Sequence, residues 1–260
     1  MKFTSVVICY FLAMALTAPA VAANSPWSGT WKVDVAKSHA VGDTFTYSPG
    51  PNGAIHYSYG TISYNYKCDG KMYVTVPGFS STCKAKGDRI HDFANYANGK
   101  ATGSGEITLS ADDKTMRSVF TNQRPDGSKE TTTTINERVS GTNGWFGTWK
   151  STKFEDSSPA TMTLDVSGTT VTSTIPEYKQ KMTLTIDGAP GELTGPTLPR
   201  GVMASWKSMG PNKVEQTIVY RGKPYNYDIF TLSADGKTLT DVGWTAGKEN
   251  QKLTTVYDKQ

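Results

Sequence analysis

The amino-acid sequence predicts an all-β fold made of two tandem antiparallel up-and-down β-barrels, with roughly eight to ten strands in each. Three observations lead to it: the chain repeats itself, apolar residues alternate with polar ones, and glycine-containing turns separate the alternating runs. Closure into barrels would also remove the exposed sheet edges that an open meander of so many strands leaves.

The repeat is visible as matching motifs in the two halves of the chain. Residues 27–32 (WSGTWK) recur at 145–150 (WFGTWK), and residues 109–115 (LSADDKT) recur at 232–238 (LSADGKT). Between them, CDG at 68–70 matches IDG at 186–188, and NGK at 98–100 matches RGK at 221–223. Four matches in the same order, at an offset of about 120 residues, indicate a duplication.

The alternation has the period of two that is typical of strands with one buried face. In the second repeat, Met162, Leu164 and Val166 alternate with polar residues up to a Ser167-Gly168 turn. In the first repeat, Ile55 shares its parity with Tyr57 and Tyr59, and Ile62 shares its parity with Tyr64 and Tyr66. No segment has the length and periodicity that would predict an amphipathic helix.

The N-terminus has the pattern of a secretory signal peptide. Lys2 precedes an apolar run over residues 6–16, and small residues at A-x-A spacing follow up to Ala23. The apolar run is too short to cross a membrane. We therefore expect a signal peptide over 1–23, a first barrel over 24–140, a short linker over 141–146 and a second barrel over 147–260. The mature protein is expected to be periplasmic or secreted.

Charge and cysteine content limit the possible partners of the protein and predict a covalent link within it. The formal net charge is +4 at pH 7 with basic and acidic residues interspersed, which does not favour nucleic acid or an anionic membrane as a partner. If Cys9 leaves with the signal peptide, Cys68 and Cys83 remain, and an even count in an oxidising compartment predicts a disulfide. Such a short loop would add about 3 kcal/mol of stability. The alternative is a pair of buried free thiols.

The motifs at the two ends of each repeat resemble those of the calycins, the lipocalins and fatty-acid-binding proteins, and of small exported bacterial lipocalin-like proteins. Gly-Thr-Trp-Lys opens each repeat, and a basic residue stands near each end, as in VYDK at 256–259. The resemblance implies that the first-strand tryptophan plugs the barrel and that the last-strand basic residue packs over it. Carried over within each repeat, it pairs Trp31 with Arg138 and Trp149 with Lys259 as structural seals.

Two features depart from the fatty-acid-binding proteins. The intervals 36–42 and 153–159 are too short to hold their two lid helices. Their Arg-x-Tyr carboxylate clamp is also missing, because Thr255 precedes Tyr257 and the matching residues of the first repeat are Thr134 and Asn136. Fatty-acid binding by that mode is therefore not expected.

Residues that could carry catalysis or hold a metal do not form a recognisable pattern. His39, His56 and His91 lack the paired spacing of metal ligands, and the acidic pairs at 112–113 and 155–156 lie in turn or loop sequence. The sequence contains no nucleophile elbow and no phosphate-binding loop. We expect neither enzyme activity nor a cofactor.

Tyr57, Tyr59, Tyr64 and Tyr66 are the candidate ligand-binding residues. Their rings would offer apolar walls with polar tips, whereas the alternative is cross-strand packing that fills the barrel completely. The leading hypothesis is an exported protein whose first barrel binds a small apolar or aromatic molecule without chemical change. The apolar residues of the second repeat would then fill its interior, namely Met162, Leu164, Met182, Leu184 and Ile186. Rival hypotheses are protein recognition, such as inhibition of an exported protease, and a structural envelope protein with no ligand.

Overall fold

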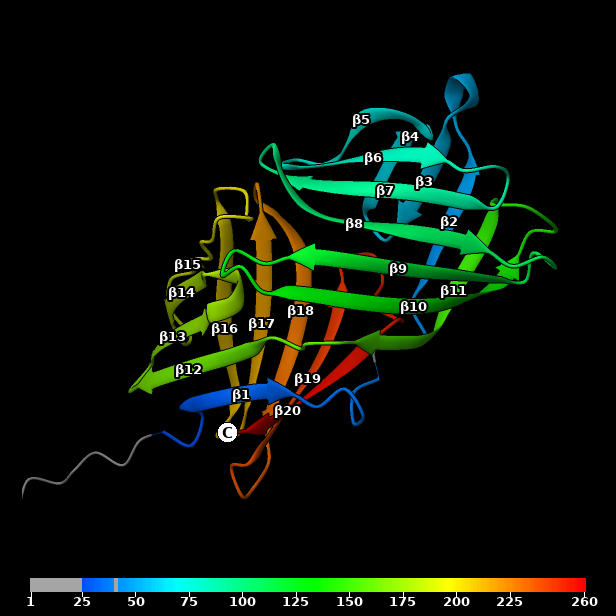
Figure 1. Ribbon diagram of the computed structural model, residues 1–260. Coiled ribbons are helices and arrows are strands. Elements are labelled where there is room, and N and C mark those ends of the chain that lie inside the picture. Colours follow the sequence, from blue (N-terminus) through cyan, green and yellow to red (C-terminus); the bar gives the residue numbers. More distant parts are fainter. Residues whose placement is uncertain (1–24, 40–41) are drawn as a thin grey trace, which may run out of the picture.

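The computed structural model describes residues 25–39 and 42–260 and consists almost entirely of β-strands. The strands form two ten-stranded antiparallel sheets, and each sheet curls into a nearly closed barrel (Figure 1). The predicted all-β fold with two barrels is confirmed. The predicted signal peptide over 1–23, with Cys9, lies outside the described residues.

The first barrel is continuous in sequence. Its sheet has the order β4-β3-β2-β11-β10-β9-β8-β7-β6-β5. The strands are β2 (Thr44–Pro49), β3 (Ile55–Tyr59), β4 (Ile62–Tyr66), β5 (Asp69–Val76), β6 (Phe79–Ala85), β7 (Ile90–Ala97), β8 (Lys100–Leu109), β9 (Thr115–Gln123), β10 (Lys129–Ser140) and β11 (Gly147–Asp156), and the short 3-10 turn η1 (Pro51–Gly53) precedes β3.

The second barrel takes one strand from the other end of the chain. Its sheet has the order β14-β13-β12-β1-β20-β19-β18-β17-β16-β15. The strands are β12 (Thr161–Ser167), β13 (Thr170–Ile175), β14 (Gln180–Thr185), β15 (Gly191–Glu192), β16 (Val202–Gly210), β17 (Lys213–Tyr220), β18 (Lys223–Leu232), β19 (Thr238–Thr245) and β20 (Leu253–Lys259), together with β1 (Gly29–Val33), while the turn η2 (Pro176–Tyr178) joins β13 to β14.

The repeated turn motifs set the hairpins. Asn98-Gly99 joins β7 to β8 and Arg221-Gly222 joins β17 to β18, and all four residues have positive φ. Two such residues in a row form the tight turn whose twist matches the strands that it connects. Glycine adopts this conformation without the steric cost that a Cβ brings.

The first strand of each repeat lies in the sheet of the other repeat. β1 pairs with β12 and β20, whereas β11 pairs with β2 and β10. The barrels are therefore built from residues 44–156, and from residues 161–259 with 29–33, rather than from 24–140 and 147–260. The reason is that residues 141–146, which we interpreted as a linker between domains, form the turn of the β10–β11 hairpin. Strands joined by so short a connection usually pair with each other.

The strand exchange also corrects the predicted seals. Lys259 Nζ lies 5.0 Å from the ring centroid of Trp31, and the Arg138 guanidinium carbon lies 4.2 Å from that of Trp149. The predicted pairs Trp31–Arg138 and Trp149–Lys259 are wrong, although the same four residues form the two contacts. Both indoles are fully buried, and each donates its Nε1–H at 3.0 Å to the carbonyl oxygen four residues earlier.

Each sheet leaves one seam, where its two end strands do not pair along their length. In the first barrel the seam lies between β4 and β5, and the predicted Cys68–Cys83 disulfide ties the segment between these strands to β6. In the second barrel it lies between β14 and β15, where Lys181 and Thr194 exchange backbone hydrogen bonds of 3.0 and 2.9 Å. The disulfide prediction is confirmed.

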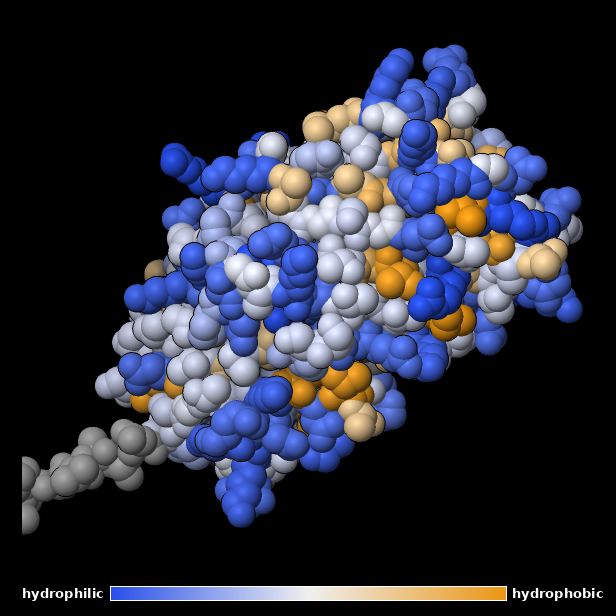
Figure 2. All heavy atoms as spheres, viewed as in Figure 1, coloured by the Kyte–Doolittle hydropathy of each residue, from blue (hydrophilic) through white to orange (hydrophobic). Residues whose placement is uncertain are grey.

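The surface in view is mostly polar, with small apolar patches between charged side chains (Figure 2). Among the described residues, no helix has the length and apolar character needed to cross a membrane.

Candidate ligand cavities

Each barrel contains an internal cavity of about 190 Å³, and a groove of about 780 Å³ runs between the barrels. A cavity of about 150 Å³ in an apolar protein core holds one benzene molecule. Each internal cavity therefore has room for a molecule with a single ring and a short substituent.

Aromatic rings form most of the wall of the first cavity. The centroids of Tyr57 and Tyr64 are 5.0 Å apart, and those of Tyr47 and Tyr57 are 5.6 Å apart. Two further rings extend the wall, with Phe93 lying 5.9 Å from Tyr66 and 6.1 Å from Phe120. These spacings are typical of mutually packed rings. The complete lining is Tyr47, Tyr57, Tyr64, Tyr66, Tyr73, Thr75, Ser81, Thr82, Cys83, Phe93, Asn95, Ile107 and Phe120.

One part of this wall is polar but uncharged. The Ser81 hydroxyl donates to Asn95 Oδ1 at 2.8 Å, from the neighbouring strand. Burial raises the pKa of Tyr64 to about 12, and it raises the pKa values of Tyr57 and Tyr66 further. The tyrosines are therefore neutral at physiological pH.

Three of the four predicted ligand-binding tyrosines line the first cavity, namely Tyr57, Tyr64 and Tyr66. Tyr59 does not, because it lies where the barrels meet. Its hydroxyl is 3.3 Å from Thr245 Oγ1 in the second barrel, and Lys248 Nζ lies 5.1 Å from its ring centroid. The period-two pattern placed Tyr59 on the correct face, but the neighbouring barrel covers that end of β3.

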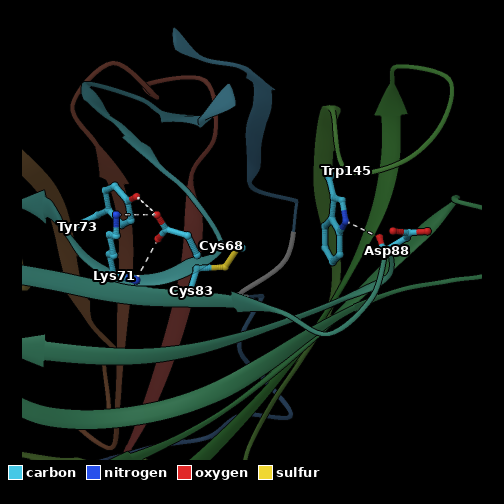
Figure 3. Close-up of a disulfide and its surroundings, with 7 residues drawn as sticks. Cys68, Lys71, Tyr73, Cys83, Asp88 and Trp145 are labelled. Carbon is cyan, nitrogen blue, oxygen red and sulfur yellow. Dashed lines mark hydrogen bonds and ion pairs between the residues drawn. A yellow bond between two sulfur atoms is a disulfide. The ribbon is translucent and has the colours of Figure 1, made fainter. Parts of the chain in front are cut away.

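Near the disulfide, the first barrel is closed by an aromatic stack. The rings of His91 and Trp145 lie 3.9 Å apart and almost parallel. Trp145 Nε1 donates to the Asp88 carbonyl oxygen at 2.8 Å (Figure 3). Burial lowers the pKa of His91 to about 4. The sulfurs of Cys68 and Cys83 lie within 4.8 Å of a His91 ring nitrogen, but the disulfide occupies both of them. These three residues therefore do not offer the thiolates that a metal would need.

The other histidines lie away from this stack. His56 Nδ1 lies 2.9 Å from Asn65 Oδ1 on the exposed side of the β3–β4 hairpin. The backbone of His39 bridges to Thr254 of β20.

The second cavity contradicts the expectation that the second barrel fills its own interior. Met162 and Met182 line the cavity rather than filling it, while Leu164 and Leu184 pack in the core beside it. The lining combines Trp206, Phe230 and Tyr257 with aliphatic side chains and with two carboxyl groups, those of Asp228 and Asp241. The remaining lining residues are Ser173, Ile175, Gln180, Leu193, Gln216 and Ile218.

The two aspartates were missed in the sequence, although their parity is informative. Asp228 shares the parity of the buried residues Phe230 and Leu232 on β18, and Asp241 shares that of Leu239 on β19. An acidic residue on the buried parity of a strand is the signal that would have identified both. The aromatic residues missed in the first cavity are Tyr47, Tyr73, Phe93 and Phe120. They carry no comparable signal because inward-facing aromatic residues are ordinary in a protein core.

The groove between the barrels meets the first cavity at the seam of that barrel. Its lining includes Ile62 and Ser63 of β4 and Thr75 and Val76 of β5, and Thr75 also lines the first cavity. Across the groove, the β17–β18 hairpin contributes Tyr220, Arg221, Lys223, Pro224, Tyr225 and Tyr227.

No protein-family model matches the chain, and comparisons with curated proteins and with solved structures also found no match. The resemblance to calycins therefore remains an expectation from the sequence motifs. The function has to be inferred from the residues that line the cavities.

Proposed function

We propose that this is an exported binding protein whose first barrel holds a small neutral aromatic molecule without changing it chemically. The observation that carries the proposal is the cavity of about 190 Å³ whose wall is built mainly from aromatic rings. Ligand sites in proteins are commonly lined by apolar and aromatic side chains with a few well-placed polar groups. Export is supported by the disulfide, since such bonds persist in oxidising compartments.

The polar groups favour an uncharged guest. Within the described chain no acidic or basic side chain lines this cavity, and the available groups are hydroxyls and the Asn95 amide. A ring with one hydroxyl or carbonyl would stack against the tyrosines and exchange hydrogen bonds with these groups. A charged guest would lose its hydration without gaining a counter-ion, which is costly.

The seam between β4 and β5 provides the route into this cavity in our proposal. These strands do not pair along the seam, and the groove between the barrels reaches it at Thr75. A guest could therefore pass between the two strands without breaking the hydrogen bonds of the sheet.

Calorimetric titration of the purified protein with phenol, cyclohexanol and benzoate tests the proposal. Phenol should bind saturably, and at least tenfold more tightly than either cyclohexanol or benzoate. Ser81→Leu adds apolar volume on the inner face of β6 beside Asn95 and should abolish phenol binding. Ser80→Leu makes the same change one residue earlier, on the other face of that strand and outside the cavity lining, and should leave binding unchanged.

Equal affinity for phenol and benzoate, or phenol binding that survives Ser81→Leu, would contradict the assignment. Failure of all three probes to bind would also overturn it, and would favour the protein-recognition hypothesis instead.

A further inference from the structure

The second cavity holds a buried pair of carboxyl groups that the proposed function does not use. Asp228 on β18 and Asp241 on β19 both line it, and among the described residues no lysine, arginine or histidine does. Burying an ionised carboxylate without a positive partner is costly, so such groups usually pair with a cation or become protonated.

Asp228 is held in place by neutral donors. Gln216 Nε2 donates to Asp228 Oδ2 at 2.8 Å, and Asn226 Nδ2 donates to Oδ1 at 2.7 Å. Gln216 is itself oriented by Trp206, whose Nε1–H donates to Gln216 Oε1 at 2.8 Å. Both donors to the carboxylate favour its ionised form, while burial raises the pKa of Asp228. The chain of hydrogen bonds fixes the direction of the carboxylate but supplies no positive charge.

Asp241 lies beside it and has no hydrogen-bond partner within the described residues. Its Oδ1 atom is fully buried and unpaired. Burial, together with the nearby charge of Asp228, raises the pKa of Asp241 to about 8. At neutral pH the folded protein therefore carries a proton on Asp241, and this proton is what a bound cation would displace.

The first barrel shows that a barrel of this kind does not require the acidic pair. Across β16, β17, β18 and β19, four residues stand in register: Trp206, Gln216, Asp228 and Gly243. The corresponding row across β6, β7, β8 and β9 is Cys83, Phe93, Gly105 and Phe120.

The same place in the two barrels therefore differs in chemistry. In the first barrel the Phe120 ring covers Gly105, and in the second the Asp228 carboxylate covers Gly243. Counting from the repeated LSAD motif, Asp241 corresponds to Ser118. The duplicated scaffold thus carries an uncharged cavity in one copy and an acidic one in the other.

We infer that the second cavity binds a small protonated amine whose apolar part is no larger than one ring. Asp228 and Asp241 would receive the ammonium group. The rings of Trp206 and Phe230, whose centroids are 5.6 Å apart, line the space beside the carboxylates, with Tyr257 also in the wall. Aromatic faces attract cations, and this attraction strengthens where water is excluded. The site goes beyond the proposed function because it lies in the other barrel and takes a positively charged guest instead of a neutral one.

Calorimetry with benzylamine and with benzyl alcohol, which has nearly the same shape but no charge, tests the inference. In the Ser81→Leu protein, whose first cavity is filled, benzylamine should bind at pH 7 at least tenfold more tightly than the alcohol. Asp228→Asn keeps the size of the side chain but removes the charge, and should weaken benzylamine binding at least tenfold. Ser81→Leu fills the first cavity and should leave benzylamine binding unchanged, so failure of this site and failure of the first site are distinguishable.

Proton release gives a second measurement that does not depend on a variant. The titratable groups that face the cavity are Asp228, Asp241 and Tyr257. Binding of benzylamine should lower the pKa of Asp241, so that its proton passes to the buffer. Heats measured at pH 7 in phosphate and in Tris should then differ in proportion to the ionisation enthalpies of these buffers.

Equal affinity of the Ser81→Leu protein for amine and alcohol would overturn the inference. So would benzylamine binding that is abolished by Ser81→Leu, binding that is unaffected by Asp228→Asn, or an absence of binding to the folded protein.

Discussion

Asp241 illustrates how one buried side chain reports on its surroundings. Its carboxyl group has no hydrogen-bond donor in the described chain, while Asp228 receives two. Leaving a buried polar group unpaired costs about 1–3 kcal/mol, more when the group is charged. A protein selected for stability alone would gain by replacing it, so Asp241 is best explained by the guest that we propose for this cavity.

Asp241→Asn should therefore change the dependence of stability on pH. The pKa of Asp241 rises from 3.8 to about 8 on folding, so between these values the folded state binds more protons than the unfolded state. This contribution makes wild-type stability fall as the pH rises from about 4 to 8, with no further loss above. The asparagine variant lacks it and should be more stable than wild type at pH 8, on the order of 2 kcal/mol.

Urea unfolding at pH 8 and pH 4 measures this difference. The variant should gain little at pH 4, where wild-type Asp241 is protonated in the folded state and close to half protonated in the unfolded state. An equal gain at both pH values, or a loss at pH 8, would show that Asp241 is not held protonated in the fold.

At the scale of elements, the positions of turns were easier to predict than the pairing of the strands on either side of them. Glycine-containing turns were expected from the sequence, and the structure has them at 98–99 and 221–222, where both residues of each turn have positive φ. The segment 141–146 was recognised as irregular, but its role was mistaken. Polar, glycine-rich composition is the same in a hairpin turn and in a linker, and only the pairing of β10 with β11 distinguishes them.

The cavities could not be predicted for a different reason. Parity indicates which side chains point inward, and it correctly placed Tyr57, Tyr64 and Tyr66. Whether inward side chains fill a barrel depends on the sum of their volumes and on the barrel radius. The sequence pattern contains neither quantity, so Met162 and Met182 were expected to fill a space that they only line.

The seams show two solutions to the same structural problem. Cys68 and Ile186 are equivalent in the two repeats, but only Cys68 forms a covalent bond, its disulfide with Cys83. The seam of the second barrel is bridged instead by the backbone of Lys181 and Thr194. A disulfide that closes a loop of this size adds about 3 kcal/mol. The double variant Cys68→Ser, Cys83→Ser should lose about that amount in denaturant unfolding.

Reductant provides the control for the disulfide prediction. It should destabilise the wild type to the level of the double variant and leave the double variant unchanged. Thiol labelling of unfolded wild-type protein without reductant should find neither Cys68 nor Cys83 free, and labelling of both would contradict the bond.

At the scale of the whole molecule, the barrels are joined by more than the two exchanged strands. Arg124 Nη2 lies 2.9 Å from Glu130 Oε1 in the first barrel, and the Tyr178 hydroxyl of the second barrel donates to Glu130 Oε2 at 2.6 Å. On the other side, the Gln251 amide donates to Thr44 Oγ1 at 2.8 Å. The barrels therefore meet through specific polar contacts, and β1 closes the second barrel by inserting beside the C-terminal strand β20.

This closure leads to a prediction that distinguishes exchanged strands from barrels that each close with their own repeat. Trp31 and Trp149 are fully buried, so changing either one to alanine should cost about 3–5 kcal/mol. The effect should appear in the barrel that receives the strand. Trp31→Ala should speed amide hydrogen exchange in β12 and β20, whereas Trp149→Ala should speed it in β2 and β10, because these are the strands paired with β1 and β11.

Trp145→Ala removes a half-buried ring that stacks on His91 and should cost less than either change. Faster exchange in β2 and β10 after Trp31→Ala, with β12 and β20 unaffected, would mean that each repeat closes its own barrel, and the exchange of strands would then be wrong.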